Sequence, residues 1–327
     1  MPVRPETIER FSSLSNVAIS QGALLSRHTR FGIGGPADVL LEISEEASFI
    51  QAIGISKSSG AAYTVIGGGT NLIVSDAGFA GIVLRFTGAA IASNGMVIGA
   101  QAGAELQALV DHSIASGLRG IETMTGIPGS VGAAVYGNAG AYGHSMHESV
   151  RSVRFFDGTV IRTIGNAECE FRYRESVFKQ HKDWIIFSTE LVLDRGVSEE
   201  LRKTADEIFQ VRLAKYPADM KCAGSIFKNL VLAELAETVQ RQVPAQVIRE
   251  GKVPSAYFLE QVGAKGVRNG GIRVADYHAN LIYNEGGGTA AELREIIHDL
   301  KSRVRARFGL ELEEEVQYVG FAANGAV

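Results

Sequence analysis

The sequence predicts a globular α+β protein with more than one domain. Its 327 residues exceed the length of one ordinary domain, and 46% of them are hydrophobic, enough to build a sizeable buried core. Short β-branched and aromatic runs bounded by glycine or aspartate share the chain with a few longer segments of helical periodicity. We therefore expect two or three units in which strands and helices are mixed.

Residues 37–86 resemble a small α/β unit, with short strands and one helix-like stretch, and from Gly88 to about Asp194 strands dominate. Two helices interrupt them, over 45–60 and over 104–117, and the second ends at Gly117, a residue type that suits the left-handed backbone following a helix. The expected strands are 37–44 (ADVLLEIS), 63–69 (YTVIGGG), 72–86 (LIVSDAGFAGIVLRF), 96–103 (MVIGAQAG), 152–158 (SVRFFDG) and 184–193 (WIIFSTELVL).

Two longer helices are expected after Asp194, the second of them at the end of another α/β unit that follows Pro217. The first runs from Glu199 to Tyr216 and ends at Pro217. The second spans 289–309, where apolar residues fall on one helical face and Gly309 follows. These apolar residues are Leu293, Ile296, Ile297, Leu300, Val304 and Phe308. The basic run "KSRVRARF" in this helix fans around its axis, so we interpret it as a solvated face.

Charge and cysteine content exclude several classes of protein. Lys and Arg total 32 against 36 Asp and Glu, so the net charge of −4 offers no general attraction to nucleic acid. Cys169 and Cys222 form neither a disulfide framework nor the paired spacing of a zinc site, so we expect no metal and a reducing, cytoplasmic compartment. The uncharged stretches 86–104 and 123–143 are too polar for membrane helices.

Glycine is the most informative residue type. Three successive glycines lie in "VIGGGTN", but Leu72 stands where a dinucleotide fingerprint needs its third glycine, and a strand-like run follows instead of a helix. The loop still suits a phosphate, because glycine exposes N–H groups and Thr70 and Asn71 add side-chain donors. A plain tight turn remains the alternative for this stretch.

A second glycine cluster lies in "TGIPGSVGAAVYGNAGAYG". Its glycines are Gly126, Gly129, Gly132, Gly137, Gly140 and Gly143. Two loops that expose backbone predict one extended ligand, such as a pyrophosphate joined to a large planar ring. The alternative for this segment is a glycine-rich turn in the core.

Five motifs in series resemble those of the UDP-N-acetylenolpyruvoylglucosamine reductase (MurB) family, flavoenzymes of peptidoglycan precursor synthesis. They are "VIGGGTNLIVSD", "GIPGSVGAAVYGNAGAYG", "YRESVFK", "AGSIFKN" and "LELEEEVQYVG". The chain between the third and fourth lacks the tyrosine-bearing insertion of the longer form, so it is similar to the shorter, type II form. The resemblance implies NADPH-dependent reduction of UDP-N-acetylglucosamine enolpyruvate through FAD.

The resemblance also implies a fold and a cofactor site. A two-part FAD-binding region of the vanillyl-alcohol-oxidase (PCMH-type) fold would occupy 1–86 and 87–205, joined by a C-terminal strand over 311–327, and a separate α/β substrate-binding domain would occupy 206–310. FAD is expected to be non-covalent, because neither glycine loop contains a histidine to tether it. The implied FAD contacts are Gly67, Gly68, Gly69, Thr70, Asn71, Leu72, Ser130, Gly132, Ala133 and Gly140.

Three residues would carry the chemistry. Hydride delivery to C3 of an enolpyruvyl ether builds negative charge on C2 and its carboxylate, so the protein must stabilise an enolate and supply a proton. By resemblance Arg174 polarises the enolpyruvyl group, Ser225 is the general acid at C2, and Glu315 works with the arginine on the substrate carboxyl. From the residues alone, Arg174 is also compatible with a surface strand and Ser225 with a helix cap.

Further substrate or nicotinamide contacts follow from the same resemblance. They are Tyr142, Tyr173, Lys215, Asn229 and Asn280. His278 is interpreted as structural, Cys222 as a small filler, and Glu311, Glu313 and Glu314 as solvated carboxylates of a half-exposed strand. The family's usual prolines around "AGSIFKN" are replaced by Lys221-Cys222 and Leu230, which affects the loop shape.

Two other functions remain open on the sequence. One is another flavin enzyme on the same scaffold, such as a sugar or lactone oxidase, which would react with oxygen and would not need Arg174, Ser225 and Glu315 together. The other is a non-catalytic flavin or nucleotide-sugar binding protein, which would not need an acid at Ser225. We expect a monomer that contacts neither nucleic acid nor membrane.

Overall fold

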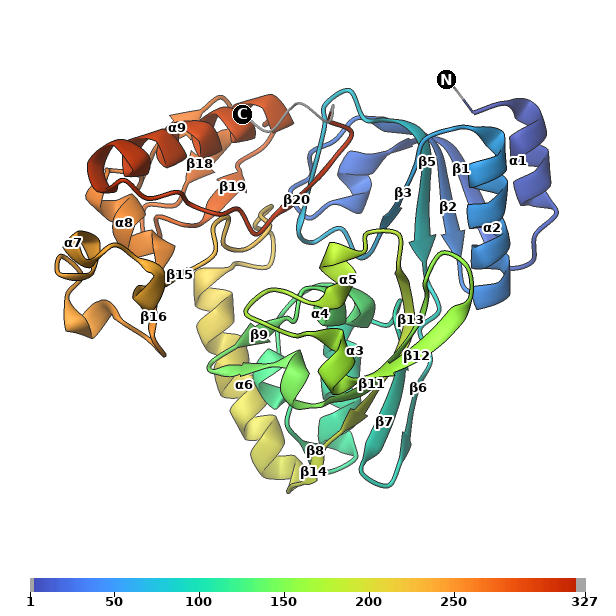
Figure 1. Cartoon of the computed structure of the whole chain (residues 1–327), viewed down its shortest axis with the longest axis horizontal. Coiled ribbons are helices and arrows are strands. Elements are labelled where there is room, and N and C mark those ends of the chain that lie inside the picture. The colour runs from blue at the N-terminus through green and yellow to red at the C-terminus, as the bar shows by residue number, and fades with distance from the viewer. Residues whose placement is uncertain (1–2, 322–327) are drawn as a thin grey trace. The chain divides into compact units, whose positions relative to one another are not determined.

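The computed structural model describes residues 3–321 and divides into two compact units (Figure 1). Among the described residues, unit 1 comprises 3–23, 37–69 and 80–218, and unit 2 comprises 24–36, 70–79 and 219–321. The three-part division at residues 86, 205 and 310 stays a prediction. Residues 1–2 of its first part and 322–327 of the expected C-terminal strand lie outside the described residues.

The first part of unit 1 is a four-stranded sheet with the strand order β1-β2-β5-β3, with helices α1 and α2 packed together beside it (Figure 1). Strands β3 and β5 run parallel, with Tyr63 opposite Ile82. The bounds are α1 Pro5–Ser12, β1 Val17–Leu24, β2 Pro36–Ile43, α2 Glu46–Ser59, β3 Tyr63–Ile66 and β5 Phe79–Phe86. This is the α/β unit that the sequence predicts.

The second part of unit 1 is an antiparallel five-stranded sheet with the order β12-β11-β13-β7-β6. Its strands are β6 Ile91–Asn94, β7 Val97–Gln101, β11 Val150–Phe156, β12 Ile161–Gly165 and β13 Ile185–Val192. Its helices are α3 Leu106–Ala115, α4 Val131–Tyr136, α5 Val177–Gln180 and α6 Ser198–Lys215. Phe49, Phe86 and Phe187 meet edge to face, which joins the two sheets through one apolar core.

Unit 2 has its own apolar core beneath helix α9 (Figure 1). The helix presents Leu293, Ile296, Ile297, Leu300 and Val304 to this core, as its periodicity predicts. The bounds are β4 Leu72–Val74, α7 Glu237–Gln240, α8 Ser255–Gln261, β17 Arg268–Asn269, β18 Ile272–Val274, β19 Ile282–Asn284, α9 Ala290–Phe308 and β20 Gln317–Val319. Strands β17, β18 and β19 form an antiparallel sheet, and β20 pairs in parallel with β4.

Short elements complete both units. Two-residue strands are β8 Leu118–Arg119, β9 Gly140–Ala141, β10 His144–Ser145, β14 Asp194–Arg195, β15 Leu230–Val231 and β16 Lys252–Val253. The 3₁₀ turns are η1 Leu25–His28, η2 Glu122–Met124, η3 Met146–Glu148, η4 Asn166–Cys169, η5 Leu232–Glu234 and η6 Ala245–Val247. Within the described part of the chain, no helix combines the length and apolar character needed to cross a bilayer.

Two segments differ from the sequence-based expectation. Helix α4 lies inside the second glycine cluster, where the glycine content suggested only loop, and Ser130 caps it by accepting the Ala133 N–H. Among the described residues of the expected C-terminal strand, 311–321, regular strand structure is confined to β20, although Leu310 and Leu312 before it are buried as their alternation suggested.

Candidate active site

The two glycine loops touch each other in unit 1. A Cβ added to Gly67 would lie 3.2 Å from the Ser130 Oγ, and one added to Gly68 would lie 3.3 Å from the Gly129 Cα. The first loop follows β3, and the second enters α4. Their backbones can approach each other because Gly68 and Gly129 have no side chains. A plain tight turn at 67–69 does not account for this contact. The arrangement suits a ligand that lies across exposed backbone, as FAD would.

Other glycines of the second cluster serve close packing within unit 1. A Cβ on Gly132 would lie 2.7 Å from the Ala102 Cβ, and the Gly132 N–H donates to the Ala102 carbonyl at 2.9 Å. Gly140 lies in β9, where a Cβ would meet the His144 carbonyl at 2.3 Å. Their roles as FAD contacts, like that of Ala133, stay predictions. The structure adds that the positions of Gly132 and Gly140 also require glycine for the fold.

Arg174 lies in a tight turn of unit 1 and not in a surface strand. Its φ of +58° is in the left-handed region, which is unusual for a residue with a Cβ. The Arg174 Nη2 donates to the Gly140 carbonyl at 3.0 Å, and the Lys179 ammonium donates to the Arg174 carbonyl at 2.8 Å. The guanidinium also lies 5.4 Å from the centroid of the Tyr173 ring. These contacts fix the direction of the guanidinium, and they exclude the surface-strand alternative.

Ser225 and Glu315 belong to neighbouring backbone segments of unit 2. Ser225 forms an isolated β-bridge with Leu281, and no helix begins at it, so the helix-cap alternative is wrong. The Glu315 N–H donates to the Ile226 carbonyl at 2.8 Å, directly after Ser225 in the chain. The Asn71 Nδ2 donates to the Glu315 carbonyl at 2.8 Å. The sequence predicted Asn71 as an FAD contact and contained no signal for this link.

The other carboxylates of the acidic run have basic partners in unit 2. Glu311 pairs with Arg305, and Glu313 pairs with Lys228. Glu314 accepts from Lys301 at 2.7 Å and from the Tyr318 hydroxyl, and burial together with this carboxylate raises the pKa of Tyr318. Glu311 and Glu313 are exposed as expected, whereas the Glu314 side chain is largely covered. The expectation of a solvated Glu314 is therefore wrong.

The expected substrate contacts are distributed over both units. In unit 1, Tyr142 is 49% exposed with a φ of +54°, and Lys215 ends α6 with its ammonium 5.1 Å from the Tyr216 ring centroid. In unit 2, the Asn229 Oδ1 accepts the Ser255 N–H at 3.4 Å. Asn280 is only 2% exposed, and its amide is bonded to neighbouring protein groups.

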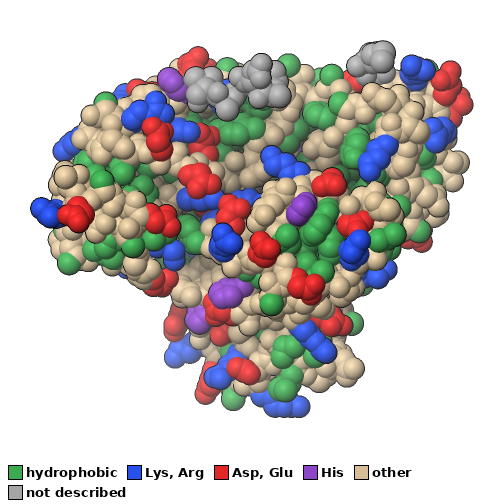
Figure 2. Space-filling model, viewed as in Figure 1, with side chains coloured by type: hydrophobic (Ala, Val, Ile, Leu, Met, Phe, Trp, Pro, Cys, Tyr) green, Lys and Arg blue, Asp and Glu red, His purple; other side chains and the backbone are tan. Residues whose placement is uncertain are grey.

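The cysteines and the remaining charged groups do not form a second reactive centre in the part of the chain that the structure describes. Burial raises the pKa of Cys169 to about 12 and also raises that of Cys222, so both are poor nucleophiles. No group of His, Cys, Asp and Glu among residues 3–321 has the arrangement of a metal site. Figure 2 shows acidic and basic side chains interspersed on the viewed face.

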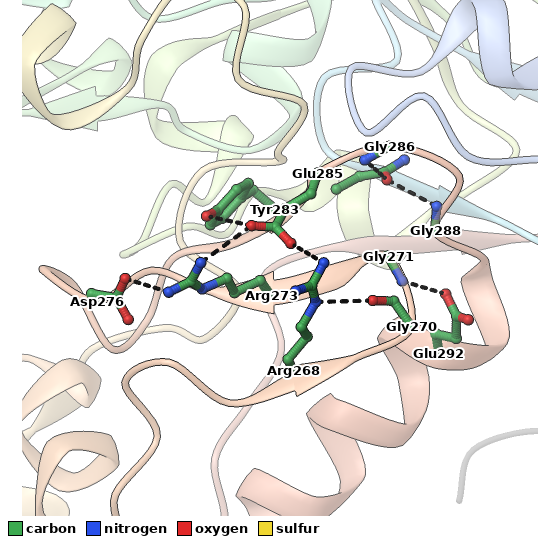
Figure 3. A network of polar contacts seen from close by, with 11 residues as sticks. Arg268, Gly270, Gly271, Arg273, Asp276, Tyr283, Glu285, Gly286, Gly288 and Glu292 are labelled. Atoms are coloured by element: carbon green, nitrogen blue, oxygen red, sulfur yellow. Dashed lines mark hydrogen bonds and ion pairs between the residues drawn. The ribbon is translucent and has the colours of Figure 1, made fainter.

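A polar network on β17–β19 has balanced charges (Figure 3). Glu285 bridges Arg268 at 2.7 Å and Arg273 at 3.3 Å, and Asp276 accepts from Arg273 at 2.5 Å. The Tyr283 hydroxyl also donates to Glu285. Because each cation contacts a carboxylate, this network cross-links the three strands and presents no excess charge to a ligand.

Comparisons with known proteins agree with the geometry. A family model described as "UDP-N-acetylenolpyruvoylglucosamine reductase, C-terminal domain" matches residues 216–319, and one described as "FAD binding domain" matches residues 37–163. The UDP-N-acetylenolpyruvoylglucosamine reductase of Solibacter usitatus is 60% identical over 311 residues, which cover 95% of this chain and 100% of that protein. The chain belongs to the UDP-N-acetylenolpyruvoylglucosamine reductase family.

More distant members of the reductase family are also similar over most of their length. The Rubrobacter xylanophilus reductase is 36% identical over 302 residues, covering 90% of this chain and 93% of that protein. The crystal structure of the Thermus caldophilus reductase superposes with a TM-score of 0.71 at 28% identity, covering 93% of this chain and 98% of that one.

Membership of the reductase family confirms the predicted fold class, an α+β chain with an FAD-binding region and a separate C-terminal domain. It also shows that the protein is an FAD-dependent oxidoreductase. The contact between Gly68 and Gly129 is compatible with this cofactor, because neither residue carries a side chain that would cover the backbone beside it.

Proposed function

We propose that the protein reduces UDP-N-acetylglucosamine enolpyruvate to UDP-N-acetylmuramate, with NADPH as co-substrate, for peptidoglycan precursor synthesis. The observation that carries this assignment is the backbone hydrogen bond from the Glu315 N–H to the Ile226 carbonyl. It holds the segment of the expected acid, Ser225, next to the segment of the expected carboxylate, Glu315. A binding protein would have no need for this pair, and an oxidase would have no need to protonate carbon.

FAD, when bound, supplies the hydride chemistry that links NADPH to C3 of the enolpyruvyl group. In this proposal Gly67, Gly68, Gly69 and Ser130 hold the FAD pyrophosphate through exposed backbone and a hydroxyl. Thr70, Asn71 and Leu72 continue the loop, and Asn71 also holds Glu315. The oxidation of NADPH to NADP⁺ and the uptake of one proton balance the two hydrogens added to the substrate double bond.

Arg174, Ser225 and Glu315 act on the substrate. The guanidinium of Arg174 is a fixed cation and binds the carboxylate on which charge develops when C3 gains a hydride. Glu315 acts with it on the substrate carboxyl group. The Ser225 hydroxyl donates its proton to C2 and is reprotonated from water. A hydroxyl is a weak acid, but a carbanion-like carbon is basic enough to accept its proton.

Tyr142, Tyr173, Lys215 and Asn229 are assigned to the nucleotide-sugar and nicotinamide parts of the ligands. Tyr142 is suited to stacking because it is exposed, and Lys215 is suited to phosphate because its ammonium is a cation. Two buried free cysteines agree with a cytoplasmic location.

The decisive test separates this function from its rivals in one anaerobic experiment. NADPH is added to the yellow protein, and UDP-N-acetylglucosamine enolpyruvate is added after bleaching. We expect NADPH to bleach the flavin absorbance and the enolpyruvyl compound to restore it. Restoration by oxygen alone would identify an oxidase, and bound flavin that NADPH leaves unbleached would point to a non-catalytic binding protein.

A further inference from the structure

We propose that Asn280 is a positioning residue that acts through Ser225, and not a contact to the substrate. The inference rests on the proposed function, because it concerns the proton that Ser225 delivers. Asn280 lies in unit 2 before β19 and is 2% exposed. A side chain this well covered is poorly placed to meet a ligand, so its amide must be explained by its protein partners.

The Asn280 amide replaces a missing strand partner for Phe227. Its Oδ1 accepts the Phe227 N–H at 2.9 Å, and its Nδ2 donates to the Phe227 carbonyl at 2.8 Å. One planar amide therefore satisfies both polar groups of one residue, as a neighbouring strand would do. The Nδ2 also donates to the Ser255 Oγ at 2.7 Å, and Ser255 in turn donates to the Phe227 carbonyl at 3.3 Å.

The backbone around Asn280 holds Ser225 directly. The Ile226 N–H donates to the Asn280 carbonyl at 3.2 Å, and Ser225 forms its β-bridge with Leu281. The segment 225–228 is thus bound by Asn280 along two successive residues. The same segment is also bound to the acidic run, because the Ile226 carbonyl accepts the Glu315 N–H. Movement of Phe227 would therefore displace both Ser225 and the backbone that carries Glu315.

The chain offers a matched control in Asn284. It is 5% exposed, lies in β19, and its side chain also makes three hydrogen bonds, to the Phe31 carbonyl at 3.0 Å and from the N–H groups of Gly286 at 2.9 Å and Gly288 at 3.0 Å. Figure 3 shows these two glycine N–H groups converging on one amide. Replacing Asn284 removes the same number of side-chain hydrogen bonds, one of them buried and two partly buried, and none of them involves the segment 225–228.

The test compares Asn280→Ala with Asn284→Ala in the FAD-loaded protein. Urea unfolding should show that both variants are destabilised, because each loses a hydrogen bond to a buried backbone group, that of Phe227 in Asn280→Ala and that of Phe31 in Asn284→Ala. Amide hydrogen exchange at Ile226 and Phe227 should accelerate in Asn280→Ala alone. In stopped-flow measurements both variants should be bleached by NADPH at the wild-type rate, whereas recovery with the enolpyruvyl substrate should slow by roughly 10-fold to 100-fold in Asn280→Ala only.

A double variant decides whether the effect passes through Ser225. In the Ser225→Ala background, Asn280→Ala should add little further slowing, since the acid that it positions is already missing. Ser255→Ala is the substitute variant if Asn280→Ala fails to fold. It retains both hydrogen bonds between the Asn280 side-chain amide and Phe227. It should therefore slow the recovery with substrate by less than the roughly 10-fold to 100-fold expected for Asn280→Ala.

Three outcomes would overturn the inference. Equal slowing in Asn280→Ala and Asn284→Ala would make Asn280 a general stabilising residue. Full additivity with Ser225→Ala would show that it acts elsewhere, as a substrate contact would, and a weakened substrate affinity at unchanged maximal recovery rate would say the same. A wild-type protein that the substrate does not reoxidise would refute the proposed function, and the inference would fall with it.

Discussion

The glycine loops of unit 1 and the Ser225 segment of unit 2 achieve exact placement by opposite means. At Gly68 and Gly129 the missing side chains let two backbones touch. At Ser225 the backbone is held by side chains, since the Asn280 amide binds Phe227 and the Asn71 amide binds Glu315. The first arrangement depends on the absence of side chains, and the second depends on hydrogen bonds from particular side chains. The two regions should therefore respond differently to mutation.

The largest expected effect is at Ser225, in the region whose backbone is held by side chains. Ser225→Ala should leave the bleaching of FAD by NADPH nearly unchanged, because that step transfers no proton to C2. Recovery with the enolpyruvyl substrate should slow by roughly 10²-fold or more, within the usual range for loss of a general acid. Stopped-flow absorbance measures both steps in one preparation, and circular dichroism checks the fold. Equal slowing of both steps would mean that Ser225 only shapes the pocket.

The next prediction concerns the glycine loops. Gly68→Ala should release most of the bound FAD, because its Cβ would lie 3.3 Å from the Gly129 Cα and 3.4 Å from the Ser130 nitrogen, both of them backbone atoms. Gly54→Ala is the control, since a Cβ at that exposed position in α2 has no neighbour within 4 Å. The flavin-to-protein absorbance ratio reports the result. Full FAD content in Gly68→Ala would remove this loop from the cofactor site.

How much could be read from the sequence follows the same contrast. The glycine positions after the helices at Gly117 and Gly309 and the apolar face of α9 are local patterns, and the structure confirms them, whereas the cofactor role of the glycine loops stays a prediction. Helix α4 was missed because its glycines outweigh its short apolar run. The partners of Asn280 were not predictable, because an asparagine carries no sign of which residue it binds, and Phe227 lies 53 positions away. The roles of Arg174, Ser225 and Glu315 came from family resemblance alone.

A smaller effect is expected at the start of α9, which is capped by Asp76, a residue far from it in the sequence. The Asp76 Oδ1 accepts the Ala290 N–H at 2.8 Å and its Oδ2 accepts the Ala291 N–H at 3.0 Å, at the start of α9. Thr289 caps the same helix from within the local sequence. Asp76→Ala and Thr289→Ala should each lower the free energy of unfolding of unit 2 by about 1 kcal/mol. Urea denaturation would show this, and an unaltered midpoint for Asp76→Ala would make the distant cap dispensable.

The smallest expected effect is at a purely local device in unit 1. The Asp157 carboxylate accepts the N–H groups of Val160 and Thr159, each at 2.8 Å, and pairs with Arg162. The Val160 N–H first, then Arg162 and the Thr159 N–H, lower the pKa of Asp157 from 3.8 to about 2. Because the folded pKa is the lower one, the stabilisation is fully present above pH 3.8 and is lost as the pH falls through about 2.

Arg162→Ala separates the backbone contribution from the ionic one at this turn. Carbon-detected NMR titration of the Asp157 carboxyl should show a pKa that rises only part of the way toward 3.8, because both backbone donors remain. The comparison variant is Arg154→Ala, which removes an exposed arginine of the adjacent strand β11 that pairs with Glu46 and should leave the Asp157 titration in place. A return of the pKa to its ordinary value in Arg162→Ala would assign the shift to the ion pair. The turn at Asp157 would then depend on a side-chain partner, as the Ser225 segment does. It would not be an example of placement by backbone groups alone.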